Sequence, residues 1–300
     1  MEKYIGAKAF AEKCGITERR VRLLCQEGRI EGAVKLGWSW SIPADSPKPF
    51  DGRVARQFKN NFVRLGSIDV SSLNALRDRN PVEDKLYTNV NTDDLIASII
   101  MLGSLMDGRE YTHDEILSVF SLSPARSLSF EDALRIAAFR SILLRSSGET
   151  FDYAVKTVLG MHAAFTQGYD DRNGASFKDA PSLVDGALAS DIPFDFQMES
   201  FFMRFSREWK GIHPVFKSVL LLNEFIKTRP FEKDNALFAL LVSCSMLVSQ
   251  GFLPPYLDDS MMDELNATLA LARSKGNFED LARLFERAMF DSYSRIFHLA

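Results

Sequence analysis

The stretch Gly211–Leu253 reads GIHPVFKSVLLLNEFIKTRPFEKDNALFALLVSCSMLVSQGFL and decides the expected fold of this 300-residue chain. Two apolar runs, Phe216–Ile226 and Ala236–Val248, flank a short polar break, which predicts two helices joined by a tight loop. The second run is apolar on all sides, so we expect it to be a central core helix. Asp234 is placed to cap its start, and Gly251 follows its end.

The rest of the chain favours a mostly α-helical fold. The composition, 46% hydrophobic and 25% charged residues, is that of an ordinary globular protein. No signal peptide or membrane segment is visible, and the core run is too short to span a bilayer, so we expect no membrane partner. Helical patterns are expected at 92–106, 130–144, 153–165, 193–209, 266–275 and 278–297.

Cysteines and histidines give no sign of a metal site. Cys14, Cys25 and Cys244 are scattered and lack ligand spacing, and the four histidines do not cluster. We interpret the cysteines as reduced core thiols of a cytoplasmic protein. We therefore expect neither a metal nor a cofactor.

Charge is divided unevenly along the chain. Residues 1–80 hold 15 Lys/Arg against 9 Asp/Glu, a balance of +6, whereas residues 81–300 hold 21 against 31, a balance of −10. This division suggests that the first part of the chain meets an anionic partner and the second does not. We expect a domain at 1–50, a Pro-rich linker with a basic bridging helix at 51–80, and a helical domain at 81–300.

The first domain has the pattern of a helix-turn-helix. A helix over Tyr4–Ile16 ends at Gly15, and Thr17 then caps a second helix. Alternating residues within 30–43 predict a hairpin, or wing. The segment Gly28-Arg-Ile-Glu-Gly-Ala33, with Gly37, Trp40, Ile42 and Pro43, resembles small winged domains of the MerR and excisionase type.

This resemblance implies binding to double-stranded DNA through the second helix and the wing. Arginine near the start of a recognition helix reads guanine or contacts phosphate. The expected DNA-binding residues are Thr17, Arg19, Arg20, Arg22, Arg29 and Lys35. A helix-turn-helix used only for protein contacts is the alternative.

The loop Thr228–Leu237, TRPFEKDNAL, resembles the signature H-P-F-x-[DE]-G-N-[GK]-R of the Fic family. The surrounding order supports the resemblance: a His-Pro helix start, a Phe before the loop, and Gly-Phe after the second helix. Those residues are His213, Pro214, Phe225, Pro230, Phe231, Asn235, Gly251 and Phe252. The resemblance implies an all-helical Fic-like domain with a short flap hairpin, which we place near 173–178.

The same comparison implies that the chemical positions are lost. Arg229 replaces the general-base His and stays protonated, so it cannot accept a proton. Lys233 replaces the acid that holds Mg²⁺, and an ammonium has no lone pair for a metal. Asp234 replaces a Gly and is expected to repel phosphate. The degenerate signature positions are Arg229, Lys233, Asp234, Asn235, Ala236 and Leu237; no catalytic residue is expected.

A second motif of the family is also altered. Gly103-Ser-Leu-Met-Asp-Gly108 resembles the inhibitory segment [ST]-x-x-x-E-[GN]. Gly103 stands at the Ser/Thr position and Asp107 at the Glu position, while Gly108 is kept. The family's Glu pairs with an Arg at the position of Leu240, so we expect this segment to have nothing to restrain.

These patterns predict a DNA-binding regulatory protein whose Fic-like domain is a catalytically inactive sensing or dimerising module. One alternative is an enzyme of altered chemistry that binds a phosphorylated substrate through Arg229 and Lys233. Another is an interaction scaffold that accepts a peptide in the Fic-like groove. Small DNA-binding domains usually act in pairs on neighbouring half-sites of the duplex. We therefore expect a homodimer, held for example by the apolar stripe of side chains Phe285, Met289 and Tyr293.

Overall fold

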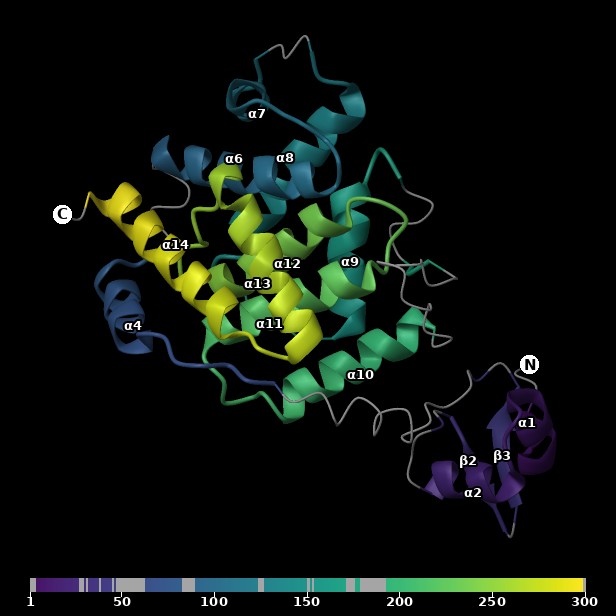
Figure 1. Cartoon of the computed structure of the whole chain (residues 1–300). Helices are drawn as coiled ribbons and strands as arrows, with labels where there is room; N and C mark the ends of the chain where they lie inside the picture. The colour runs from purple at the N-terminus through teal and green to yellow at the C-terminus, as the bar shows by residue number, and fades with distance from the viewer. Residues whose placement is uncertain are drawn as a thin grey trace. The chain divides into compact units, whose positions relative to one another are not determined.

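The computed structural model describes residues 4–26, 30, 32–37, 39–44, 46, 63–82, 90–123, 127–149, 152, 154–170, 176–178 and 193–298 (Figure 1). The chain divides into two compact units, residues 1–60 and 61–300, each with its own hydrophobic core. Arg29 of the expected DNA-binding set lies outside the described residues. So does the 173–175 part of the expected flap, and 176–178 are not in a strand.

The first unit combines two helices with a three-stranded antiparallel sheet in the order β1-β3-β2. Its elements are β1 (Tyr4–Gly6), α1 (Ala7–Cys14), α2 (Glu18–Gln26), β2 (Val34–Leu36) and β3 (Ser39–Pro43). The helix expected from Tyr4 begins only at Ala7, because Tyr4–Gly6 pair with β3. Backbone pairing thus overrides the helical pattern over these three residues.

The turn and the hairpin of the first unit are as the sequence predicts. Gly15 ends α1 with φ 64°, a left-handed conformation that glycine adopts without strain. Thr17 Oγ1 then accepts a 3.3 Å hydrogen bond from the N–H of Arg20 at the start of α2. The two helices and β3 bury the side chains Phe10, Val21, Leu24 and Ile42, each at most 1% exposed.

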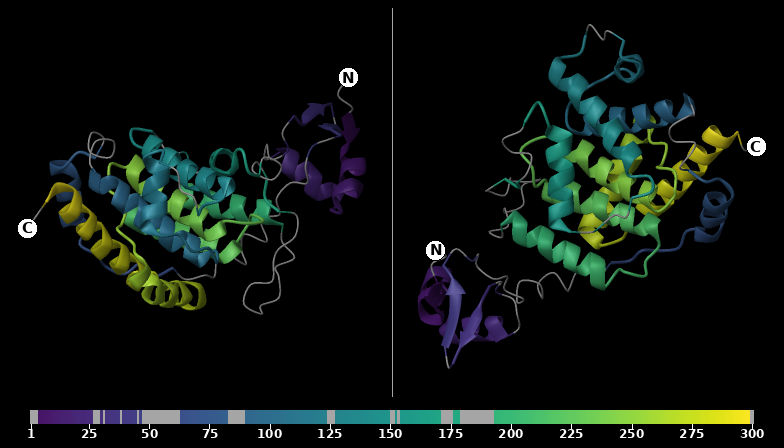
Figure 2. Two further views of the ribbon diagram at one scale, coloured as in Figure 1. Left: turned by 90° about the horizontal axis from the view of Figure 1, so that it is seen from above. Right: turned by 180° about the vertical axis from the view of Figure 1, so that it is seen from behind.

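The second unit is helical and is built around α12, as Figure 1 and the two further views of Figure 2 show. Its helices are α4 (Val70–Arg79), α6 (Val90–Met106), α7 (His113–Phe120), α8 (Phe130–Arg145), α9 (Val155–Thr166), α10 (Phe194–Arg207), α11 (Pro214–Thr228), α12 (Asn235–Ser249), the 3₁₀ turn η1 (Asp259–Met261), α13 (Met262–Lys275) and α14 (Glu279–Phe297). Helix α12 packs on α11, α6, α8 and α9.

The prediction of a central core helix is confirmed, because every residue from Asn235 to Val248 is buried. Its neighbour α11 starts as expected, with His213 Nδ1 accepting the N–H of Val215 and Pro214 in the first turn. A fully apolar helix needs neighbours on all sides, and α12 has them.

Of the segment 51–80, where a linker and a bridging helix are expected, the structure describes residues 63–80. Among the described residues of this segment only Val70–Arg79 is helical. Arg64 instead pairs in parallel with Asn277, and its N–H donates to Gly276 O at 2.8 Å. Leu73 of α4 is fully buried in the core of the second unit, so the end of this segment packs on that unit.

The stripe on α14 is not a dimer face. Phe285, Met289 and Tyr293 are each 0% exposed and belong to the core of the second unit. Aromatic side chains at helical spacing are buried here by the domain's own packing.

Within the described residues, every helix is too short or too polar to cross a bilayer.

Candidate functional site

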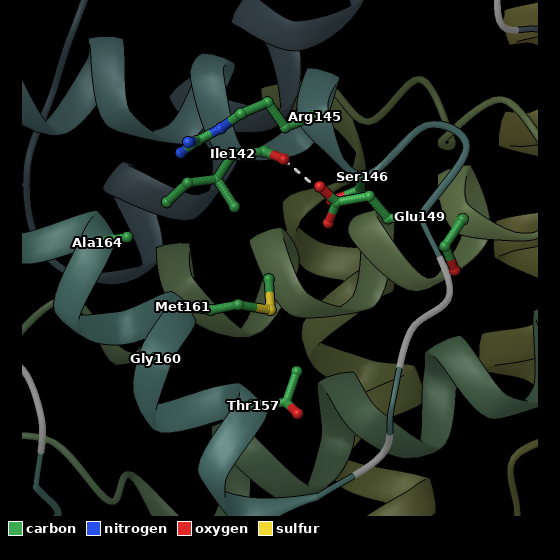
Figure 3. Close-up of a pocket in the computed structure, with 9 residues that line it drawn as sticks. Ile142, Arg145, Ser146, Glu149, Thr157, Gly160, Met161 and Ala164 are labelled. Atoms are coloured by element: carbon green, nitrogen blue, oxygen red, sulfur yellow. Dashed lines mark hydrogen bonds between the residues drawn. The ribbon is translucent and has the colours of Figure 1, made fainter.

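Two clefts of the second unit differ in the chemistry of their linings. The first, about 240 Å³, lies between α8 and α9 and contains none of the expected site residues (Figure 3). Its lining includes the apolar side chains Ile142 and Met161, and Ser146 Oγ donates to Ile142 O at 2.9 Å. Nothing in its chemistry defines a ligand.

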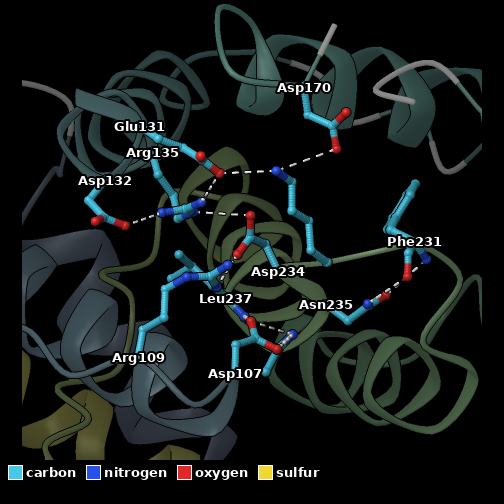
Figure 4. A network of polar contacts seen from close by, with 12 residues as sticks. Asp107, Arg109, Glu131, Asp132, Arg135, Asp170, Phe231, Asp234, Asn235 and Leu237 are labelled. Atoms are coloured by element: carbon cyan, nitrogen blue, oxygen red, sulfur yellow. Dashed lines mark hydrogen bonds and ion pairs between the residues drawn. The ribbon is translucent and has the colours of Figure 1, made fainter. Parts of the chain in front are cut away.

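The second cleft, about 290 Å³, lies at the loop between α11 and α12 and contains four of the six degenerate signature positions together with Asp107. It is lined by Asp107, Arg109, Lys178, Arg229, Glu232, Lys233, Asp234 and Asn235. Seven of these eight side chains are charged in their usual ionisation states, so electrostatics determine what the cleft can hold. Figure 4 shows the network of polar contacts around it.

The loop itself is held by local contacts. Asn235 Nδ2 donates to Phe231 O at 2.8 Å, and Phe231 N–H donates to Asn235 Oδ1 at 2.9 Å. The Phe231 ring stacks on His162 with centroids 3.5 Å apart. Arg229 and Asp234 take left-handed backbone angles, φ 45° and φ 60°, which cost free energy for residues other than glycine. Tertiary contacts must therefore stabilise the loop.

Asp234 occupies the expected cap position, but the prediction that its side chain caps α12 is wrong. The carboxylate makes no cap hydrogen bond. It is 0% exposed and accepts hydrogen bonds from Arg109 and, at 3.0 Å, from Arg135 Nε (Figure 4). The Tyr169 hydroxyl donates a long hydrogen bond of 3.4 Å to Asp234 Oδ2. The Asp234 carboxylate thus faces two guanidinium groups, one of which, Arg135, it shares with other carboxylates.

Arg135 is the buried cation that holds this network together. Its side chain is 1% exposed, and it also binds Glu131 at 2.9 Å and Asp132. Burial lowers the pKa of Arg135, but the Asp234 carboxylate outweighs that effect and the pKa is raised. Burial and the hydrogen bond to Asp132 raise the pKa of Tyr111 to about 12, so its hydroxyl stays a donor.

Asp107, in the turn that follows α6, caps the start of α12. Its carboxylate accepts the N–H of Ala236 at 3.0 Å and the N–H of Leu237 at 2.9 Å, and its side chain is 5% exposed. The first N–H groups of a helix lack intrahelical partners and attract anions. Burial raises the pKa of the Asp107 carboxyl, although these two N–H groups oppose that shift. The protein therefore supplies its own carboxylate where a helix offers an anion site.

Gly103 explains how Asp107 reaches this position. A Cβ on Gly103 would lie 2.9 Å from Leu237 Cδ1 and 3.0 Å from Leu240 Cδ1. Helix α6 can thus lie against α12 only because residue 103 has no side chain. The segment packs on Leu240, and its Asp107 caps α12, contacts that the sequence did not indicate. Gly108, with φ 78°, ends the segment as predicted.

Four cationic side chains in or beside the cleft face carboxylates of the same chain. Lys233 Nζ lies 3.0 Å from Glu131 and 3.8 Å from Asp170, and its hydrogen bond lowers the pKa of Glu131. Arg229, 45% exposed, lies 4.0 Å from a carboxylate oxygen of Asp107. The ion pairs of Arg109 and Arg135 complete the set.

These residues do not fit a Mg²⁺–nucleotide pair. Lys233 cannot ligate a metal, and Arg229 cannot serve as a base. The N–H groups of Ala236 and Leu237 that would meet a phosphate already donate to Asp107. Within the described part of the chain, no group of three or more His, Cys, Asp or Glu could hold a metal ion.

Sequence reasoning missed Arg109, Arg135 and Tyr169. A signal existed for Arg135, because it shares a helical face with Phe139 and Ile142, which are at most 7% exposed. A charge on the apolar face of an amphipathic helix predicts a buried partner. Arg109 follows the turn at Gly108, and no local pattern indicates its role.

The expected DNA-binding residues lie together only in part. Arg19 and Arg22 are exposed on one face of α2, whereas Arg20 is half-buried at its edge. Thr17 is the helix cap, and Lys35 is exposed on β2. Leu23 and Gln26 are exposed on the same face as Arg19 and Arg22, and sequence reasoning missed them. Their spacing from Arg19, four and seven residues, was the available signal.

Comparisons with solved structures identify the fold. Fic-1 (residues 134–508) from Caenorhabditis elegans matches with TM-score 0.62 and 15% identity, covering 82% of this chain and 73% of that one. A Fic family protein from Desulfovibrio desulfuricans G20 matches with TM-score 0.56 and 14% identity, over 79% and 77%. A Fic domain containing signaling protein from Bacteroides thetaiotaomicron matches with TM-score 0.58 and 15% identity, over 78% and 99%.

The chain therefore has a Fic-like helical fold. At these identities the likeness concerns the fold alone, and function depends on the site. No protein-family model matches the sequence, and no curated protein matches it.

Proposed function

We propose that this protein is a DNA-binding regulator whose Fic-like unit is catalytically silent. The observation that carries the DNA-binding part is the exposed face of α2. Arg19 and Arg22 project from the side of the helix opposite the buried residues Val21, Leu24 and Cys25. A short helix fixed on a small core, with cations on its outer face, suits the major groove of a duplex.

The wing supports this proposal independently. Lys35 is exposed in β2, the strand at the edge of the sheet. A lysine there is available for a phosphate, which positions a protein on DNA without reading its sequence. The residues 1–50 also carry a positive balance, 9 Lys/Arg against 6 Asp/Glu.

Binding of the full chain to duplex DNA tests the proposal. Fluorescence anisotropy between 50 and 200 mM salt should show affinity that falls as salt rises, because phosphate contacts release counterions. Arg19→Ala should weaken binding by about 1–3 kcal/mol. Lys8→Ala is the matched control, since it removes an exposed cation from α1. Affinity that does not depend on salt, or an equal loss in both variants, contradicts DNA binding by α2.

The proposal of a silent Fic-like unit rests on the self-neutralised cleft. Arg109, Arg135 and Lys233 face carboxylates of the same chain, and Asp107 accepts hydrogen bonds from the N–H groups at the start of α12. We expect no transfer of AMP or phosphate to the protein itself or to other proteins. Incubation with labelled ATP and Mg²⁺ checks this expectation, and incorporation above a protein-free control refutes it.

A regulatory role for the Fic-like unit requires that it bind a ligand or bring two DNA-binding units together as a dimer. A phosphorylated ligand or a peptide in the cleft is the sensing alternative, which the half-exposed Arg229 favours. We propose a homodimer, because one nine-residue α2 covers few base pairs. Light scattering of the full chain at tens of micromolar should give twice the mass of 33.8 kDa. A monomer rules out pairing in the absence of DNA.

A further inference from the structure

The exposed face of α2 contains an apolar side chain at its centre. Leu23 is 44% exposed, whereas Val21 and Leu24 beside it in sequence are at most 1% exposed. One exposed leucine is ordinary on a protein surface. The surroundings of Leu23 distinguish it: Arg19 lies four residues before it, Arg22 one before it, and Gln26 three after it, all on the exposed side of the helix.

The chemistry of this face matches base edges and not only phosphates. The major groove presents hydrogen-bonding groups at every base pair and one apolar group, the C5-methyl of thymine. Arginine reads guanine, and glutamine reads the N6 and N7 of adenine. A face made only for phosphate contacts would need neither Leu23 nor Gln26, because neither side chain carries charge.

The spacing along α2 agrees with stacked base pairs. A helix rises about 1.5 Å per residue, so Arg19 and Leu23 are about 6 Å apart along the axis, and Leu23 and Gln26 about 4.5 Å. Base pairs stack about 3.4 Å apart. The three side chains therefore span roughly three base-pair steps, with Leu23 and Gln26 over neighbouring pairs and Arg19 about two pairs away.

We propose that Leu23 reads the methyl group of a thymine, and that Gln26 reads an adenine at the neighbouring base pair. This inference rests on the proposed DNA-binding function and adds the residues that determine sequence preference. Arg19 supplies the guanine contact on the other side of the thymine. Because Arg22 is 62% exposed and paired with Glu18 at 2.6 Å, we assign it to the backbone of the duplex.

The test begins with selection of duplexes from random DNA by the full wild-type chain. The selected thymine is then replaced by deoxyuridine, which removes only the methyl group and leaves the protein unchanged. Wild type should lose roughly fourfold in affinity, the factor associated with one buried methyl. Leu23→Ala should bind thymine and uracil duplexes equally. Leu36→Ala, which truncates a 61% exposed leucine of the wing, should keep the wild-type loss.

A second arm replaces the neighbouring adenine by 7-deazaadenine, which lacks the N7 acceptor. The affinity of wild type should fall about tenfold on this replacement, as for a good bidentate contact. Gln26→Ala should bind the adenine and 7-deazaadenine duplexes with equal affinity. The readout is affinity at fixed salt, and the salt dependence should be the same for all variants because no phosphate contact is changed.

The outcomes separate the two proposals. If wild type shows no salt-dependent binding, the DNA-binding function fails and this inference fails with it. If wild type binds and selects a sequence, but that sequence lacks a thymine, only the readout by Leu23 is overturned. Equal affinity of wild type for thymine and uracil duplexes also overturns it, as does an undiminished uracil effect in Leu23→Ala.

Discussion

Two regions of this molecule concentrate arginine and use it in opposite ways. On α2, Arg19 and Arg22 stand exposed, and Arg22 retains 62% of its side-chain exposure while paired with Glu18. Around the loop before α12, Arg135 of α8 is 1% exposed and binds three carboxylates. Arg109 also binds one of these, Asp234. The number of cations is similar, but their availability to a partner is not.

The difference shows that exposure and pairing, rather than residue type, decide what an arginine does. A guanidinium in water keeps its charge for an incoming phosphate. A buried guanidinium already satisfied by carboxylates is part of the fold, because separating that pair leaves a charge without solvation. We therefore expect the α2 arginines to affect binding and the cleft arginines to affect stability.

The largest expected effect is on Arg135. Arg135→Ala leaves the buried carboxylate of Asp234 with one guanidinium fewer, which should lower the free energy of unfolding by about 3–5 kcal/mol. Urea denaturation of the full chain measures it. Arg287→Ala is the control, since its pair with Glu264 is 64% and 47% exposed and worth little. A loss of unfolding free energy below about 1 kcal/mol for Arg135→Ala would contradict the stabilising role assigned to the cleft arginines.

A smaller effect is expected at Asp107. Asp107→Ala removes the acceptor for the N–H groups of Ala236 and Leu237 and should cost about 1–2 kcal/mol in unfolding free energy. It also frees an anion site beside Arg229. Isothermal titration with inorganic phosphate should then detect binding that wild type lacks. Equal phosphate affinity in both proteins would show that Asp107 does not occupy that site.

The pH dependence of stability follows from the same carboxyl group. Burial raises the pKa of Asp107 in the folded state above its unfolded value, so the folded chain binds this proton more readily. The stability of wild type relative to Asp107→Asn should therefore fall as pH rises from about 4 towards neutrality. Denaturation midpoints of both proteins across that range provide the measurement. A difference that grows with pH would mean that the N–H groups outweigh burial.

The smallest expected effect on stability is at Arg22. Arg22→Ala removes an exposed pair with Glu18 and should change the free energy of unfolding by at most about 0.5 kcal/mol. The same variant should weaken DNA binding and reduce its salt dependence, because one phosphate contact is lost. A large stability loss without a change in DNA affinity would reverse the roles assigned to the two regions.

Much of the fold was predictable from local patterns. The apolar runs of Gly211–Leu253 give α11 and α12, and the caps at His213 and Gly15 are where the sequence places them. For the site, the sequence predicted which residues take part but not which residues they contact. The identities of Asp107 and Asp234 were known, but their partners are far away in sequence. Asp234 pairs with α8 and with the turn after α6, and Asp107 accepts N–H groups at the start of α12.

The sequence by itself determined most of the helical segments, which helix is central, and which chemical groups the loop lacks. These follow from periodicity, side-chain volume and ionisation, which are properties of single residues and near neighbours. Only the tertiary structure decided that Asp234 turns to Arg135 and that Asp107 caps α12 across the missing side chain of Gly103. Such pairings depend on how closely helices approach, and that distance arises when the core packs.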